Sequence, residues 1–186
     1  MSSKYRTVVF IDAGCLRPGL VRRYLKIGAD QQLKWPKFMA WLSELAGDLR
    51  DCHYYDSLPE SPSDNLLRFH NFLGSELKIH LHMSSLQTKT RTCPQCKQSY
   101  SINQQRNVDM EIATDMLLLA PHFDQAILIS CDGDFATVAR KLRERFARQV
   151  TIVAWKERLS SIWHSLANNV VLLDDHAKHF ITPTRS

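Results

Sequence analysis

The sequence contains no stretch close to the roughly 20 uninterrupted apolar residues that a membrane-spanning helix requires. Its first residues, MSSKYRTVVFID, include an apolar run that is too short for a signal peptide. Its five cysteines are an odd number, and only Cys93 and Cys96 are closely spaced, so they do not provide the framework of a disulfide-rich secreted domain. We therefore expect a soluble, cytoplasmic protein in which Cys15, Cys52 and Cys131 are free thiols.

Two further absences narrow the class of protein. The chain has no glycine-rich phosphate-binding loop, and its acidic groups come late in the sequence, which disfavours a flavodoxin-like or receiver-type signalling domain. Its eight histidines show no pairing with a nucleophilic side chain. The four tryptophans are most simply interpreted as packing residues.

The chain does have enough apolar residues for one sizeable core. A length of 186 residues with 44% hydrophobic side chains fits one domain, since single domains commonly contain roughly 100 to 200 residues. The net charge of +5 and the pI near 9.0 are compatible with a polyanionic partner, because clustered Lys and Arg release counterions from a phosphate backbone. Many basic proteins bind no nucleic acid, so the charge alone does not identify the partner.

Strand and helix patterns alternate along the chain. Residues 7–11 are β-branched or apolar without polar alternation, which is typical of a strand buried on both faces of a parallel sheet. Further strands are predicted at 52–55, 77–83, 125–130, 150–154 and 170–173, and helices at 36–45, 64–74 with Asp64 as its cap, 108–120, 135–146 and 157–167. This alternation predicts an α/β fold with a doubly wound, mostly parallel sheet.

Between residues 84 and 107 apolar side chains become scarce, which predicts a long connection or an insert that leaves the core of the single domain. This segment carries the sequence CPQC, in which Cys93 and Cys96 have the spacing of half a zinc site. His80 and His82 share one face of the preceding strand, and both reach such an ion only if the connection folds back. The alternative is a loop with two reduced thiols.

Basic residues accumulate in the same insert. With Tyr100 between them, they would follow a single-stranded nucleic-acid backbone and stack a base; the alternative is a solvated charged loop. The residues concerned are Lys89, Arg91, Lys97 and Arg106. The basic residues between 140 and 148 are spread around a helix and its end, so we interpret them as a solvated face.

Acidic residues follow two of the predicted strands. Asp12 comes directly after the first strand, and Asp132 and Asp134 follow the strand at 125–130. In parallel sheets functional sites form outside the carboxyl ends of the strands, so these side chains are expected to lie close together. Asp109, in the first turn of the helix at 108–120, is a further candidate.

Carboxylates that converge in one place repel one another unless a cation neutralises them. Hard oxygen ligands select Mg²⁺ or Mn²⁺, which activate water and stabilise the charge that builds on a phosphodiester in its transition state. The predicted ligands are Asp12, Asp109, Asp132 and Asp134. Helix capping is the alternative for Asp109 and Asp134. Asp115 lies about a third of a turn round the helix from Asp109 and is predicted to support the site.

Five blocks of the sequence, in this order, resemble one known family. They are VVFIDAG, HYYD, RNVDMEIATDML, AILISCDGDFATVARKLRERF and QVTIVAW, and they extend from residue 7 to about residue 174. Together they resemble the NYN family of PIN-like nucleases, which includes LabA-like and limkain-type domains. The resemblance implies a three-layer α/β/α sandwich and a metal-dependent endoribonuclease whose acids are Asp12, Asp109, Asp132 and Asp134. It also implies that Ser130 orients the acidic cluster and that Asp115 supports it.

Two departures from the family pattern bear on activity. Members often carry Asn three residues after the first aspartate, where this chain has Cys15, so Cys15 is predicted to support the acidic site. Glycine is usual at the position of Cys131. The loss of the Asn amide keeps a second hypothesis open, a catalytically weak PIN-like module that binds RNA or regulates a partner. Arg106 and Asn107 replace a usual Lys-Gly pair and keep a positive charge. The predicted partner is single-stranded or structured RNA, and no interaction with a membrane is expected. A homo-oligomer and a DNA substrate both stay open.

Overall fold

A seven-stranded sheet forms the centre of the computed structural model, which describes residues 5–26, 31–105 and 107–183. The strand order is β5-β4-β3-β1-β6-β7-β8, and every neighbouring pair is parallel except β4 and β5. The strands span Arg6–Asp12 (β1), Asp48–Leu58 (β3), His80–Thr92 (β4), Ser99–Gln105 (β5), Gln125–Ile129 (β6), Gln149–Ala154 (β7) and Asn169–Leu172 (β8). The predicted α/β fold with a mostly parallel sheet is therefore confirmed.

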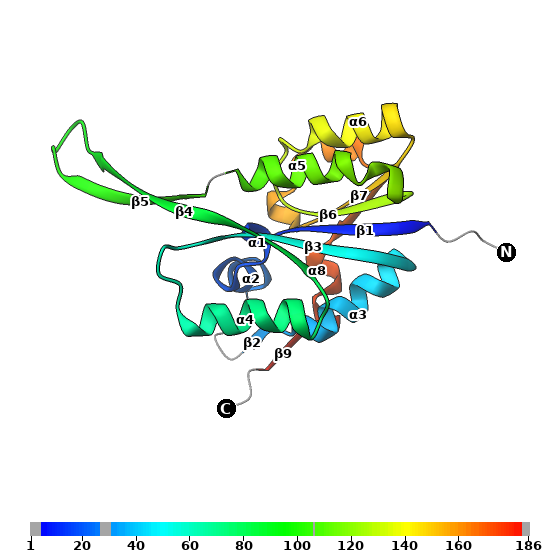
Figure 1. The fold of residues 1–186 in the computed structure, drawn as a ribbon, viewed down its shortest axis with the longest axis horizontal. Helices are drawn as coiled ribbons and strands as arrows, with labels where there is room; N and C mark the ends of the chain where they lie inside the picture. Colours follow the sequence, from blue (N-terminus) through cyan, green and yellow to red (C-terminus); the bar gives the residue numbers. More distant parts are fainter. Residues whose placement is uncertain (1–4, 27–30, 106, 184–186) are drawn as a thin grey trace.

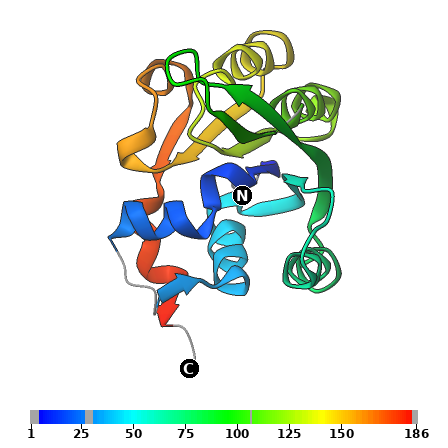
Figure 2. The ribbon, with the colours of Figure 1, turned by 90° about the vertical axis from the view of Figure 1, so that its left-hand side faces the viewer.

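Helices cover both faces of the sheet and complete a three-layer α/β/α sandwich (Figure 1, Figure 2). One layer contains α5 (Val108–Leu118), α6 (Ala136–Phe146) and α7 (Trp163–Leu166); the other contains α1 (Ala13–Leu16), α2 (Pro18–Leu25), α3 (Trp35–Ala46), α4 (Asp64–Ser75) and α8 (Leu173–His176). Within β1, Val8 and Phe10 pack on the first layer and Val9 and Ile11 on the second, because successive strand side chains point to opposite faces. This burial on both faces explains the unbroken apolar run at 7–11.

Several short elements were not predicted. They are the helices α1, α2 and α8, the antiparallel pair β2 (Gln31–Leu33) and β9 (Ile181–Pro183), and the 3-10 turns Ala120–His122, Lys156–Arg158 and Ala177–His179. Of the helices in the described part of the chain, none has the length and apolar character needed to cross a membrane.

Two local predictions are wrong. The predicted helix 157–167 is interrupted, because Leu159 is extended with ψ 119° and Ser160 packs so closely on Gly133 that an added Cβ there would lie 2.9 Å from Ser160 Oγ. This tertiary contact overrides the local helical pattern. The cap of α4 is Ser63, whose Oγ accepts the backbone N–H of Leu66 at 3.3 Å, and Asp64 occupies the first turn instead.

The segment 84–107 forms most of a long antiparallel hairpin. The first half of β4 pairs with β3 at residues 80–85, and the second half pairs with β5 at residues 86–92. Since β4 runs parallel to β3 and β1, this second half leaves the sheet at its carboxyl edge and projects beyond the body (Figure 1). We call the hairpin of residues 86–105 the arm; its tip carries Cys93 and Cys96.

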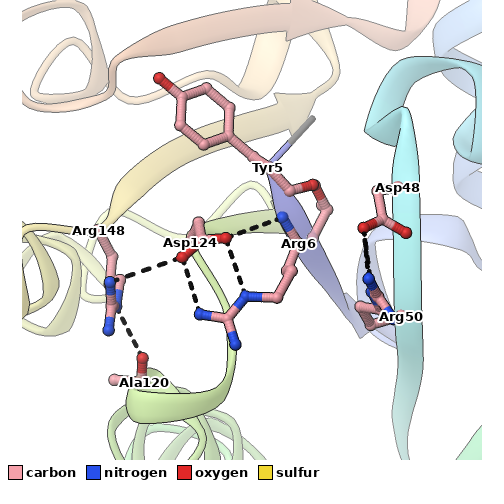
Figure 3. Close-up of polar contacts among 8 residues, drawn as sticks. Tyr5, Arg6, Asp48, Arg50, Ala120, Asp124 and Arg148 are labelled. Atoms are coloured by element: carbon pink, nitrogen blue, oxygen red, sulfur yellow. Dashed lines mark hydrogen bonds and ion pairs between the residues drawn. The ribbon is translucent and has the colours of Figure 1, made fainter. Parts of the chain in front are cut away.

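The opposite, amino-terminal edge of the sheet is fixed by an ion-pair network (Figure 3). Asp124 accepts a hydrogen bond from the backbone N–H of Arg6 at 3.0 Å and two from its guanidinium at 3.0 and 2.9 Å. Arg148 lies 3.8 Å from the same carboxylate and donates to the carbonyl oxygen of Ala120 at 2.8 Å. The hydrogen bonds from Arg6 lower the pKa of Asp124 to about 2. These contacts join the start of β1 to the segments before β6 and β7.

Candidate active site

Asp12 ends β1 with both carboxylate oxygens held in place. Its Oδ1 accepts the backbone N–H of Gly14 at 2.8 Å, and its Oδ2 accepts a hydrogen bond from Ser130 Oγ at 2.9 Å. A Cβ on Gly14 would lie 2.9 Å from Asp12 Oδ1, so the close turn after β1 favours glycine. The orientation of Asp12 is therefore fixed from two different segments.

Ser130 links Asp12 to the other strand-end acids. It directly follows β6 and is completely buried. Besides donating to Asp12, its Oγ accepts the backbone N–H of Asp132 at 3.1 Å, and Asp132 Oδ1 accepts the backbone N–H of Asp134 at 2.8 Å. A continuous chain of hydrogen bonds thus joins the carboxyl ends of β1 and β6. This is the orienting position that the family resemblance implies for Ser130.

The acids influence one another electrostatically. Burial raises the pKa of Asp12, and the charges of Asp109 and Asp132 add to this effect, while the hydrogen bonds from Ser130 and Gly14 oppose it. Burial followed by repulsion from Asp132 and Asp134 also raises the pKa of Asp109. Burial and the neighbouring charges therefore make the ionisation of Asp12 and Asp109 less favourable than it is in free solution.

Three of these acids, Asp12, Asp109 and Asp132, line one pocket of about 390 Å³ at the carboxyl edge of the sheet. Asp134 is exposed and is not among its lining residues. Within the described residues, no three His, Cys, Asp or Glu side chains are arranged to enclose a metal ion. The arrangement is thus an open acidic pocket rather than a closed ligand cage.

Other pocket residues were missed by reasoning from the sequence. Arg158 is exposed at the rim, and Tyr24 from α2 stacks on Trp155 with ring centroids 5.6 Å apart. Trp155 Nε1 donates to the carbonyl oxygen of Cys15 at 2.8 Å. Trp155 directly follows β7, so the strand-end rule that identified Asp12 also identifies this position. Tyr24 comes from a helix that the sequence pattern did not reveal.

Cys15 and Cys131, the two departures from the family pattern, lie against each other in the same pocket. Their Sγ atoms are 3.1 Å apart and share a hydrogen bond. This hydrogen bond, together with burial, raises the pKa of Cys15. Cys15 is 4% exposed, whereas Cys131 is partly exposed.

The structure places Asp115 apart from the pocket. Its carboxylate accepts a hydrogen bond from the Tyr55 hydroxyl at 2.9 Å and lies 3.5 Å from Nδ1 of His82. One turn earlier, Glu111 accepts a hydrogen bond from Ser84 Oγ at 2.9 Å. These contacts attach α5 to β3 and β4, so Asp115 acts on the position of the helix that carries Asp109 rather than on the acids directly.

The CPQC turn lies at the tip of the arm. The backbone N–H of Cys93 donates to Gln98 and that of Lys97 donates back to Cys93, both at 2.9 Å. His80 and His82 lie in the sheet half of β4, beside His53, so the connection does not fold back to bring them to the turn. Cys93 and Cys96 therefore lie close together, and no third His, Cys, Asp or Glu side chain among the described residues joins them as a metal ligand.

The structure describes the side chains of only some of the predicted nucleic-acid-binding residues. Arg91, Lys97 and Tyr100 are exposed on the arm. Arg106 and the side chain of Lys89 lie outside the described residues.

A family model described as the NYN domain matches residues 6–173. A comparison with curated proteins finds no match. Among solved structures, a protein of unknown function from Vibrio parahaemolyticus shares the fold with a TM-score of 0.65 and 18% identity, over 98% of this chain and 99% of that chain. A Sir2 protein bound to acetylated peptide reaches a TM-score of 0.47 and 12% identity over 93% and 90% of the two chains, too low to support an argument.

Proposed function

This chain belongs to the NYN domain family, whose members are generally nucleases, and on that premise we propose that it is a metal-dependent endoribonuclease. The observation that carries the proposal is the open pocket lined by Asp12, Asp109 and Asp132. Its place in the sheet supports the same conclusion, because β3 and β6 lie on either side of β1, and open α/β sheets bind ligands at such switch points.

The acids fit a Mg²⁺ or Mn²⁺ ion that keeps part of its water shell. Mg²⁺ is usually bound through one or two carboxylates together with substrate phosphates, so an open pocket suits it better than a closed cage would. Asp12 and Asp132 would hold the ion, with Asp109 and Asp134 as the further candidate ligands. When bound, such an ion lowers the pKa of water and stabilises the charge on the phosphodiester transition state.

The remaining pocket residues have roles that follow from their chemistry. Ser130 keeps Asp12 oriented toward the pocket and favours its ionised form, since a hydrogen bond donated to a carboxylate lowers its pKa. The Arg158 guanidinium offers a planar set of donors for a phosphate group. Tyr24 presents an aromatic face on which a base would stack. These two residues would hold RNA while the acids face the scissile bond.

RNA that extends beyond the pocket would follow the arm. The arm leaves the sheet at the same carboxyl edge as the acids and presents Arg91, Lys97 and Tyr100 to solvent. Basic side chains with an interleaved aromatic suit single strands without sequence preference. Lys89 and Arg106 belong to the same proposal, and cytoplasmic RNA is the substrate class.

The tip of the arm is a candidate half-site for zinc. Cys93 and Cys96 supply two thiolates, and a tetrahedral ion needs two more ligands, which would come from another molecule or from water. Metal analysis of protein purified without chelator tests this. Zinc at half an equivalent or more in the wild type, and none in Cys93→Ser/Cys96→Ser, supports the site; no zinc in either removes it.

The activity is tested by incubating labelled RNA with the wild type or with Asp132→Asn at increasing concentrations of Mn²⁺ or Mg²⁺. Asp64→Asn, which removes an exposed carboxylate at the start of α4, is the matched control. We expect cleavage by the wild type and Asp64→Asn and a loss of at least about 100-fold in Asp132→Asn, because the pocket then lacks one of its charges. RNA that is bound but left intact by all three proteins would instead support the binding module, which Cys15 in place of the usual Asn favours.

A further inference from the structure

Cys15 and Cys131 are arranged as a thiol pair inside the candidate active site. They are 116 positions apart in the sequence, yet their Sγ atoms are separated by 3.1 Å, only about 1 Å more than the length of a disulfide bond. Both line the acidic pocket, and Cys131 is the more exposed of the two, so a small solute that enters the pocket meets Cys131 first. In reducing compartments, a disulfide is typically transient and is used for catalysis or redox sensing.

We propose that Cys15 and Cys131 form a reversible disulfide that inactivates the pocket, with a hydroperoxide as the oxidant. Partial exposure makes Cys131 the thiol that meets the oxidant, and the buried Cys15 behind it is the resolving thiol. The other cysteines are differently placed. Cys52 is buried in β3, where burial raises its pKa to about 12, and Cys93 and Cys96 lie on the arm.

The reaction balances in two steps. The sulfur of Cys131 attacks one peroxide oxygen, so that an S–O bond forms, the O–O bond breaks, and water or an alcohol leaves with the thiol proton. The sulfur of Cys15 then attacks the sulfenic sulfur, which forms the S–S bond, breaks the S–O bond and releases water. Two thiols lose two electrons in total, and one peroxide is reduced. A small dithiol reverses the reaction by thiol–disulfide exchange.

The disulfide would disturb the acids because each cysteine is attached to their supports. Cys131 lies between Ser130 and Asp132, which share a hydrogen bond, and Cys15 belongs to the turn whose Gly14 N–H holds Asp12. The bond brings the two sulfurs about 1 Å closer and cross-links the two segments, and any part of this change that rotation of the side chains does not take up moves the supports of the acids. A displacement of about 1 Å in a catalytic group can reduce the rate by about 100-fold. This part of the inference rests on the proposed nuclease function.

The test uses the purified full chain, reduced and then treated with a small excess of hydrogen peroxide. Free thiols are alkylated, and peptides are mapped by mass spectrometry without reduction. We expect a Cys15–Cys131 linked peptide, a fall of at least tenfold in RNA cleavage, and recovery of both with dithiothreitol. Cys131→Ser and Cys15→Ser are each expected to lose the peroxide response relative to their own reduced activity, whereas Cys93→Ser/Cys96→Ser keeps it.

The outcomes separate this inference from the nuclease proposal. Alkylation of both thiols after peroxide, or a disulfide only between Cys93 and Cys96, overturns the pair. A Cys15–Cys131 disulfide with unchanged cleavage overturns its inactivating effect. If the reduced protein cleaves no RNA, the nuclease proposal alone fails, and Mn²⁺ binding to the reduced and oxidised forms is compared instead. Equal Mn²⁺ affinity of the two forms then contradicts the switch.

Discussion

Ser130 Oγ donates a hydrogen bond of 2.9 Å to Oδ2 of Asp12, although the two residues are 118 positions apart in the sequence. The contact joins the ends of β1 and β6 at the place where the acidic pocket opens. Because burial raises the pKa of Asp12 and this hydrogen bond opposes the rise, Ser130 keeps the carboxylate available at lower pH than its surroundings would allow.

Ser130→Ala is expected to destabilise the fold and shift the pH profile of cleavage. The loss of a donor leaves a buried carboxylate oxygen and the Asp132 N–H without their partner, which costs about 1 to 3 kcal/mol of unfolding free energy. The pKa of Asp12 rises further, so the acidic limb of the pH–rate profile moves to higher pH. Urea unfolding and pH–rate measurements test the two effects.

Ser165→Ala is the matched control, since its hydroxyl is exposed and bonds only to the nearby carbonyl of Ile162. It is expected to change the unfolding free energy by less than about 0.5 kcal/mol. Equal effects of the two substitutions on stability and pH profile would show that the bond to Asp12 has no special role.

Asp109→Asn is expected to abolish cleavage and slightly stabilise the metal-free protein. The folded-state pKa of Asp109 is raised, so its ionisation costs stability. That cost is absent below the unfolded pKa, grows as pH rises through the folded pKa, and is complete above it. The variant therefore gains about 0.5 kcal/mol at neutral pH, a small value because the side chain is exposed, and nothing near pH 3.

Bound Mn²⁺ should make the wild type more stable than Asp109→Asn, the reverse of their order without metal. A ligand that binds only the folded state at 100 times its dissociation constant adds about 2.7 kcal/mol. The wild type is expected to gain this from Mn²⁺, and Asp109→Asn to gain less. Thermal unfolding with and without Mn²⁺ measures the difference, and an equal gain would remove Asp109 from the ligand set.

The features that could be predicted from the sequence are those that local residue patterns determine. The unbroken apolar runs identified β1 and β6, and the acids at their ends followed from the strand-end rule. Helical spacing also placed Asp115 near the acids, but its tertiary partner is Tyr55 on β3, which no local pattern reveals. The contact between Cys15 and Cys131 was equally hidden, because it depends on which strands become neighbours.

Asp124→Asn is expected to weaken the amino-terminal edge of the sheet in a pH-dependent way. The pKa of Asp124 is depressed to about 2, so its contribution is present above the unfolded pKa of about 3.9 and is lost as pH falls through about 2. At neutral pH the variant should lose about 1 kcal/mol or less after solvent screening. Urea unfolding at several pH values measures this loss.

The control is Asp48→Asn, whose carboxylate pairs with Arg50 two residues away on the same strand at 2.8 Å (Figure 3). A pair within one strand joins no separate segments, so this substitution should change stability less. A difference between wild type and Asp124→Asn that stays constant down to pH 2 would contradict the assigned ionisation.

Arg158→Ala is expected to weaken RNA binding at the pocket. A guanidinium that contacts one phosphate releases about one counterion, so its removal should lower the slope of log affinity against log salt by about 0.7 for a single strand. Affinity should fall about tenfold at low salt, while unfolding stays nearly unchanged because the side chain is exposed. Fluorescence anisotropy with a labelled oligonucleotide and non-cleaving Ca²⁺ measures both quantities.

Arg145→Ala removes the same charge from the exposed last turn of α6, outside the residues that line the acidic pocket. Long-range attraction of RNA to a protein of net charge +5 would weaken equally in both variants, whereas a direct phosphate contact weakens binding only in Arg158→Ala. Matching losses in the two variants would therefore assign the effect to net charge, and Arg158 would have no contact with the substrate.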